Sequence, residues 1–334
     1  MIRVLGLALL VLAAPAGKPK PPAPPPRPPP KVDVTLSATT PTGGWAVKVT
    51  NSGTVPVRIV ADAALLDLDV TAPGGGAKVH CALPSDMVPL SDMERGLVLV
   101  PGRSYTERFD PRLYCFSERE VAALVPGATV AAHYGFGARS TSKAFVPLVA
   151  QDDPAAPGPA KSIDAAPLTL PALPAPASAP PVVPAVTDGI KLVPTVTPRI
   201  DLERTFERQV TVSVKNAGPL AVRSLFTSAT VGFLLVGPDG ATTSCGAALA
   251  PTPIPELLTT LAPGARTNVT IGLALCPSAA FRMAGLYQLR PRVDTRRVGY
   301  STVSLYRGEV LGEPSLLRLH VSTSQRPLPQ VDPP

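Results

Sequence analysis

The chain has 334 residues, a formal net charge of +7, 44 prolines and only 4% aromatic residues. A chain of about 300 residues exceeds what one hydrophobic core usually serves, so we expect two domains with small-residue cores. The excess charge precedes the first acidic residue, Asp33, and lies at Arg3, Lys18, Lys20, Arg27 and Lys31. The rest of the chain is close to neutral, which argues against a folded nucleic-acid-binding surface.

Residues 1–16 have the pattern of a cleavable secretory signal peptide. Arg3 precedes an apolar run from Val4 to Ala13, and small residues follow at Ala14 and Ala16. The alternative is a retained anchor, but the run has about half of the ~20 residues that span a bilayer. We therefore expect a secreted or periplasmic protein.

Proline-rich segments separate and flank the regions that can fold. Residues 17–30 form a basic stretch, "GKPKPPAPPPRPPP", for which we expect an extended polyproline II arm. The simplest role of this arm is that of a spacer, and the alternative is contact with anionic cell-envelope polymers. Residues 171–189 are interpreted as an interdomain linker, and residues 323–334 as a disordered tail.

Between these segments, apolar and polar residues alternate with the period of half-buried strands. The alternation covers 32–36 and 45–49 in the first half, and 210–214, 269–273 and 317–321 in the second. Turns such as Pro101-Gly102 and Pro263-Gly264 separate the runs. The predicted fold class is all-β, with antiparallel β-sandwiches.

The second half of the chain repeats strand and turn segments of the first half in the same order. This repeat predicts two copies of one domain, at 31–170 and 190–322. "VKVTNSGTVPVRIV" (Val47–Val60) returns as "VSVKNAGPLAVRSL" (Val212–Leu225), with turn residues Asn51 and Asn216 in equivalent places. After the second cysteine of each copy we expect a short helix ended by glycine. In the first copy, Ser117 and Glu120 have the spacing of a capping box.

Each copy contains two cysteines, and the repeat favours pairing within a copy over the other two connectivities. The expected disulfides are Cys81–Cys115 and Cys245–Cys276. A zinc site built from His80, Cys81, Cys115 and His133 is the alternative for the first pair. The second copy has no histidine near its cysteines, so disulfides are the better interpretation, and no metal or cofactor is expected.

No catalytic motif stands out in the chain. Ser244 and Ser301 lack the G-x-S-x-G elbow, and the three histidines (His80, His133 and His320) have no recognisable motif around them. We therefore expect no enzymatic activity, and a hydrolase with an unrecognised site is only the third interpretation.

Two surface features could contact a partner. Arginines on a predicted hairpin form a candidate anion-binding stripe (Arg290, Arg292, Arg296 and Arg297), for which a solvated strand face is the simpler explanation. The equivalent loops Ala82–Val100 and Gly246–Leu261 are the candidate contact loops, because loops on a rigid sandwich commonly carry binding specificity.

The order of turns resembles that of immunoglobulin-like domains of secreted bacterial proteins. The marks are clearest in the second copy, at Asn216, Gly218, Pro238, Gly240, Pro263, Gly264, Gly285 and Tyr287. The resemblance covers about 100 residues of each copy and implies tandem immunoglobulin-like β-sandwiches. The turn order is also weakly similar to that of the bacterial intracellular proteinase inhibitor family. The secretory signal and the cysteine pairs depart from that cytosolic family, and no inhibitory residue can be transferred.

Together these features predict a non-catalytic protein for binding, adhesion or envelope scaffolding. Its partner would be an unknown protein or a cell-envelope polymer and not a nucleic acid. A proteinase inhibitor is the alternative function.

Overall fold

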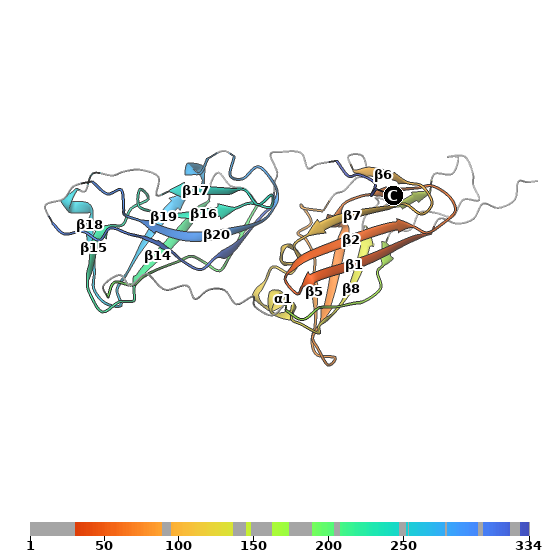
Figure 1. Ribbon diagram of the computed structural model, residues 1–334, viewed down its shortest axis with the longest axis horizontal. Helices are drawn as coiled ribbons and strands as arrows, with labels where there is room; N and C mark the ends of the chain where they lie inside the picture. The colour runs from red at the N-terminus through yellow and green to blue at the C-terminus, as the bar shows by residue number, and fades with distance from the viewer. Residues whose placement is uncertain are drawn as a thin grey trace, which may run out of the picture.

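The computed structural model describes residues 31–88, 95–135, 145–147, 162–173, 189–203, 208–246, 252, 254–277, 279–299, 303–320 and 328–333. Both halves are almost entirely β-structure and form two tandem antiparallel β-sandwiches (Figure 1). The all-β prediction is therefore confirmed. The predicted signal peptide, the proline-rich arm and most of the linker lie outside the described residues.

The first sandwich packs a sheet of order β1-β2-β7 against a sheet of order β10-β8-β4-β5, with β11 beside β8. Their bounds are β1 Val32–Thr40, β2 Gly43–Asn51, β4 Leu66–Thr71, β5 Lys78–Cys81, β7 Ser104–Phe109, β8 Thr129–Gly135, β10 Ser162–Asp164 and β11 Leu168–Thr169. A third sheet joins β6 (Gly96–Leu99), β3 (Val57–Val60) and β9 (Phe145–Pro147). The helical elements are η1 Ala63–Leu65, η2 Pro111–Leu113 and α1 Glu118–Ala123.

The second sandwich repeats these strand orders, with β12-β14-β19 facing β22-β20-β16-β17 and a separate pair β15-β18. Their bounds are β12 Leu192–Thr195, β14 Gln209–Asn216, β15 Val222–Leu225, β16 Val231–Val236, β17 Thr242–Gly246, β18 Leu258–Leu261, β19 Arg266–Gly272, β20 Gly285–Asp294 and β22 Ser315–Leu319. Strand β13 (Arg199–Leu202) adds a parallel edge to β22, and β21 (Glu309–Leu311) pairs with β20. Short 3-10 turns occur at η3 Pro255–Leu257 and η4 Leu273–Leu275.

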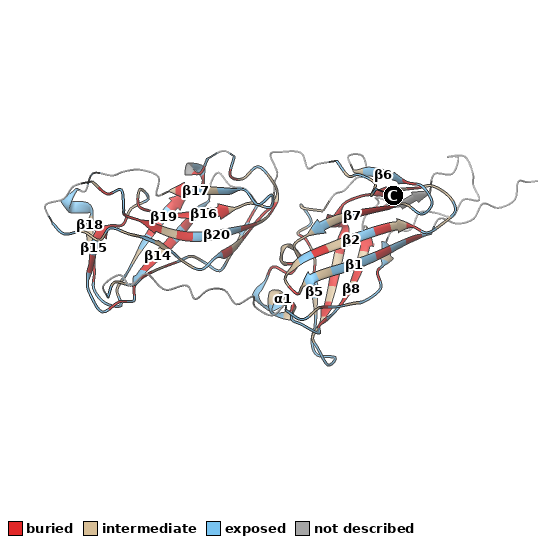
Figure 2. Cartoon of the chain, viewed as in Figure 1, coloured by how far each residue is buried: buried red, intermediate tan, exposed pale blue. Residues whose placement is uncertain are grey.

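The period-two alternation sorts side chains between core and solvent as predicted. Trp45, Val47 and Val49 of β2 are fully buried, and the intervening residues of that strand are more exposed. Strand β14 buries Val210, Val212 and Val214 in the same way. The buried residues lie on the inner faces of both sandwiches (Figure 2), where removal of apolar surface from water stabilises the fold.

Both predicted disulfides are present. Cys81 at the end of β5 pairs with Cys115 after η2, and Cys245 of β17 pairs with Cys276 after η4. All four cysteines are therefore oxidised, which leaves no thiolate for the alternative zinc site.

The helix predicted after the second cysteine forms only in the first copy. There, Ser117 caps α1, and Ser117 and Glu120 form the expected capping box. The described residues of the second copy form turns instead, with the N–H of Ala280 donating to the carbonyl of Pro277 at 2.8 Å. The prediction for the second copy is therefore wrong. Its segment has Phe281, and no carboxylate, at the position that would complete a capping box.

A buried asparagine joins two turns in each sandwich. The Asn51 amide donates to the carbonyls of Val55 and Leu99, both at 2.8 Å, and its Oδ1 accepts the N–H of Gly53 at 3.0 Å. Asn216 makes the same three bonds in the second copy, with Leu220, Leu261 and Gly218. Both side chains are fully buried, so the repeated asparagine is a structural residue of the fold.

A tyrosine at the start of β20 gives the second sandwich another immunoglobulin-like feature. The buried Tyr287 donates its hydroxyl to the carbonyl of Met283, at 2.6 Å, just upstream in the chain. A tyrosine that bonds back to the preceding corner in this way is a hallmark of immunoglobulin-like domains.

Candidate functional site

The last described residues of the chain return to the first sandwich. Strand β7 pairs with β2 on one side and forms an edge of its sheet, and residues 328–333 lie beside that edge (Figure 1). The N–H of Asp332 donates to the carbonyl of Ser104 at 2.8 Å, and the Arg103 guanidinium donates to the carbonyl of Asp332 at 2.5 Å. Leu328–Pro333, which we call the C-terminal strap, is thus bonded at Asp332 to the β7 edge and to Arg103 just before it.

The Asp332 carboxylate is the main anchor of the strap. Its Oδ2 accepts the hydroxyls of Ser104 and Thr106, both at 2.8 Å, and its Oδ1 accepts the N–H of Thr106 at 3.1 Å. Val331 is partly buried against the first hydrophobic core. Three hydrogen bonds to one carboxylate therefore set the register of the strap on β7, because bonds to a charged acceptor are stronger than neutral ones.

These contacts differ from the disordered tail that the sequence predicts for 323–334. Proline removes N–H donors, so the segment cannot build a sheet of its own. Its non-proline residues can still bond to an edge strand that is already folded.

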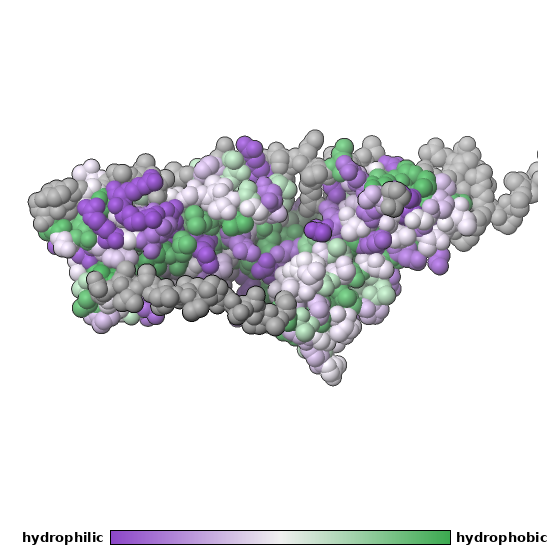
Figure 3. All heavy atoms as spheres, viewed as in Figure 1, coloured by the Kyte–Doolittle hydropathy of each residue, from purple (hydrophilic) through white to green (hydrophobic). Residues whose placement is uncertain are grey.

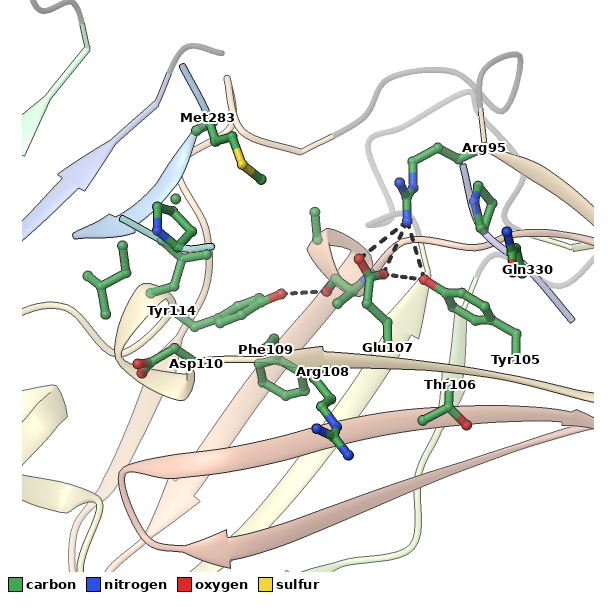
Figure 4. Close-up of a pocket in the computed structure, with 18 of the residues that line it drawn as sticks. Arg95, Tyr105, Thr106, Glu107, Arg108, Phe109, Asp110, Tyr114, Met283 and Gln330 are labelled. Atoms are coloured by element: carbon green, nitrogen blue, oxygen red, sulfur yellow. Dashed lines mark hydrogen bonds and ion pairs between the residues drawn. The ribbon is translucent and has the colours of Figure 1, made fainter. Parts of the chain in front are cut away.

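A cavity of about 740 Å³ adjoins the strap where the two sandwiches meet. Its walls come from β7, η1 and η2 of the first sandwich and from the turn before β17 and the start of β20 in the second. Figure 4 shows Tyr105, Glu107, Phe109, Tyr114, Met283 and Gln330 among its lining residues. The cavity therefore mixes apolar and aromatic walls with a polar floor, as ligand sites commonly do.

A network centred on Arg95 forms that polar floor (Figure 4). The Nη2 atom of Arg95 lies 3.3 Å from Oε1 of Glu107 and 3.4 Å from the hydroxyl of Tyr105, which itself donates to Glu107. On its other side, Nε of Arg95 donates to the carbonyl of Ala61 at 2.8 Å and lies 3.2 Å from Oδ2 of Asp62. Arg95 belongs to Ala82–Val100, one of the two candidate contact loops.

The network raises the pKa of both Tyr105 and Arg95. Burial raises the pKa of the Tyr105 phenol and the Glu107 charge raises it further, so Tyr105 is a permanent donor. Burial lowers the pKa of Arg95, but the carboxylates of Asp62 and Glu107 outweigh that effect and raise it. Glu107 also accepts the N–H of Ala63 at 2.7 Å. The carboxylate is thus already bonded to three groups, an arrangement that favours rigidity over proton transfer.

A second polar cluster joins the sandwiches through β22. Arg318 donates to Asp201 at 3.0 and 2.6 Å and to the carbonyl of Leu113 at 3.1 Å, and its guanidinium lies 4.3 Å from the ring centroid of Phe116. Leu113 and Phe116 belong to the first sandwich, so a residue of the second sandwich bonds directly across the junction.

His320 adds a further contact across the junction. Its Nδ1 lies 2.9 Å from Oδ2 of Asp86 in the first sandwich, and its Nε2 lies 2.7 Å from Oδ1 of Asp201. Burial raises the pKa of Asp201, but hydrogen bonds from Arg318 and His320 outweigh burial and lower it. The His320–Asp86 and Arg318–Leu113 contacts therefore join the two sandwiches at the junction.

The predicted arginine stripe is partly neutralised. Arg292 and Arg296 both pair with Asp294 and Glu309, at distances of 2.5 to 2.8 Å. Hydrogen bonding to Arg296 lowers the pKa of Asp294 to about 2, which reflects a tight ion pair. Arg290 and Arg297 are exposed, and Figure 3 shows a hydrophilic patch on the visible face of the second sandwich. These pairs support the solvated strand face, and anion binding stays a prediction.

The other two histidines lie on the outer face of the first sandwich, away from the cavity. Nδ1 of His133 is 2.7 Å from Asp164, and Nδ1 of His80 is 3.0 Å from Asp69. The hydrogen bond with Asp164 raises the pKa of His133, which favours its cationic form. No group of three or more side chains in the described part of the chain could hold a metal ion.

Sequence reasoning missed the β7 edge and the network on the cavity floor. Asp62 stands in a different segment from Tyr105 and Glu107 of β7, and no signal in the sequence links these residues to Arg95 or Asp332. The clue that was available is an aspartate set among prolines near the end of the chain, in "PQVDPP".

Comparison with known proteins adds little to this site. No family model matches the chain, and no curated protein matches it, so the similarity to the proteinase inhibitor family has no support. Among solved structures, the chain is similar to red sea bream transglutaminase with 13% identity and a TM-score of 0.19. The match covers 87% of this chain and 31% of the transglutaminase. Within the described residues, no helix is long and apolar enough to cross a membrane.

Proposed function

We propose that this protein is a non-catalytic binding protein that holds an extended segment of a partner protein along the β7 edge. The observation that carries the proposal is that Asp332 of the C-terminal strap already binds this edge, through its main-chain N–H to the carbonyl of Ser104 and through its carboxylate. Addition of a strand to an exposed sheet edge is a recurring mode of peptide recognition, in which main-chain bonds give affinity and side-chain sites give specificity.

The surroundings of β7 support this function. The cavity between the sandwiches offers room for partner side chains beside the edge. The Arg95 network and the Arg318 cluster fix both walls of that cavity. Rigid walls favour binding because less conformational entropy is lost when the partner docks.

The bonding of the ionisable groups supports a role without catalysis. Glu107 is bonded to Tyr105, Arg95 and Ala63, and the histidines lie against carboxylates. A general base must instead be free to reach a substrate proton.

Two disulfides and the predicted signal peptide support a secreted or periplasmic location. Disulfides persist mainly in oxidising compartments, where a small sandwich core benefits from the added constraint.

Selection from a library of random extended peptides tests the proposed function. The bait is the full chain with Asp332→Ala, which weakens the hold of the strap on β7. The matched bait carries Ser104→Ala and Thr106→Val in addition, which remove two hydroxyls from the edge but keep the side-chain shapes. We expect peptides to be enriched on the first bait and lost on the second. Enrichment that is equal on both baits would contradict the β7 edge as the binding surface.

A further inference from the structure

We infer that the C-terminal strap is a built-in competitor, and that the partner segment it mimics is an extended peptide with an aspartate followed by proline. This inference rests on the proposed function, and it names the chemistry of the ligand and the regulation of the same site.

The donors on β7 are arranged for a short carboxylate. Two hydroxyls and one main-chain N–H converge on Asp332 from Ser104 and Thr106, at 2.8 to 3.1 Å. The main-chain N–H and carbonyl of Asp332 are bonded at the same time, to Ser104 and Arg103. A glutamate would place its carboxylate one methylene further from these donors. The geometry therefore selects aspartate at this position.

The prolines of the strap favour conformations that can pair with the β7 edge strand. Pro333 follows Asp332 and restricts that residue to extended conformations, which are those that pair with a strand. Pro329 likewise restricts Leu328. Prolines also remove N–H donors from the outer side of the added segment, which limits pairing with a further strand. A partner peptide with aspartate before proline would be restricted to extended conformations in the same way.

The attachment of the strap gives it an advantage over a free peptide. His320, bound to Asp86 and Asp201 at the junction, is the last described residue before the strap, and only seven residues separate it from Leu328. A short tether raises the effective concentration of the bound segment to about the millimolar range. A free peptide must displace the strap. Its apparent affinity is therefore its intrinsic affinity multiplied by the fraction of molecules in which the edge is open.

The hold of the strap is concentrated at one end. Leu328 is 74% exposed, whereas Val331 packs on the core and Asp332 makes the hydrogen bonds. Loss of the Asp332 carboxylate should therefore open the edge and leave the β7 donors intact.

Fluorescence anisotropy with a labelled peptide tests the competition. The probe is Leu-Pro-Gln-Val-Asp-Pro-Pro, and the proteins are the wild-type chain, the Asp332→Ala variant and the control Asp33→Ala, which changes an exposed aspartate on the outside of β1. We expect the Asp332→Ala variant to bind the probe at least about tenfold more tightly than wild type, because its edge is no longer occupied. The Asp33→Ala variant should match wild type.

A second probe tests the chemistry of the ligand. The same peptide with asparagine in place of aspartate should bind the Asp332→Ala variant about tenfold more weakly, because charge-assisted bonds become neutral ones. Equal binding of both probes would overturn the aspartate preference. Equal affinity of the wild type and the Asp332→Ala variant would overturn the competition, while the proposed function would stand. If no protein bound either probe and the library yielded no peptide dependent on Ser104 and Thr106, the proposed function would fail as well.

Discussion

Asn51 offers a direct test of how the first sandwich is held together. The change Asn51→Ala removes three side-chain hydrogen bonds that join the turn after β2 to the turn after β6. It leaves the carbonyls of Val55 and Leu99 and the N–H of Gly53 without these partners. The Leu99 bond is buried, so water cannot readily replace it.

The expected loss follows from these bonds. A net contribution of about 1 kcal/mol for each bond predicts a decrease of about 3 kcal/mol in the free energy of unfolding. The unsatisfied buried carbonyl could raise the loss to about 5 kcal/mol. For a domain of this size, 3 kcal/mol corresponds to a decrease of about 10 °C in the melting temperature.

The assay uses the single tryptophan of the chain. Trp45 is fully buried in the core of the first sandwich, so its fluorescence reports the unfolding of that sandwich alone. Asn216→Ala is the matched control, because it removes the same three bonds from the second sandwich. It should leave the tryptophan transition in place and shift a second transition that is followed by far-ultraviolet circular dichroism.

Two results would refute the reasoning. A shift of the Trp45 transition by less than about 2 °C in Asn51→Ala would mean that the three bonds contribute little net stability. A tryptophan transition that moved equally with Asn216→Ala would mean that the two sandwiches unfold as one unit.

Two further predictions concern the ion pairs. The pKa of Asp294 is about 2 in the folded chain, below its ordinary value, so the charged form contributes about 2 kcal/mol of stability that is present near neutral pH and is lost as the pH falls from about 4 to about 2. Asp294→Asn should abolish this dependence in urea unfolding at a series of pH values, and an unchanged acid slope would contradict the role of Asp294. Arg318→Met should loosen the junction by removing the bond to Leu113, so the radius of gyration from small-angle X-ray scattering should rise. The Trp45 transition should persist, and an unchanged radius would show that other contacts hold the sandwiches together.

Local patterns in the sequence account for the fold. Alternation such as Val210, Val212 and Val214 reports which side of a strand is buried, because side chains of a strand point to opposite faces in turn. The repeated asparagine turns and the repeated cysteine spacing then predicted the two sandwiches and their disulfides. The helix after Cys276 could not be judged from likeness to the first copy, because a short helix depends on its capping residues.

Charge patterns predicted the surface less well. Arginines spaced by two suggested an anion-binding face, but only Arg290 and Arg292 share strand β20, and Asp294 and Glu309 neutralise Arg292 and the following Arg296. Glu309 lies on β21, and its approach to Arg292 depends on how β21 pairs with β20. The spacing of like charges along one strand says nothing about the charges that a neighbouring strand brings.

The sequence by itself determined the strands, the duplication and the disulfide pairs of this protein, because short-range periodicity or a repeated spacing indicates each of them. Only the tertiary structure decided where the candidate site lies. Asp332 meets Ser104 across 228 positions of sequence, and their contact depends on which sheet edge is left unpaired and on how the second sandwich returns the chain to it. By its sequence alone, the proline-rich segment is predicted not to fold, because it lacks N–H donors and a periodic apolar face. It becomes ordered here because β7 already presents the main-chain and hydroxyl groups that the end itself lacks.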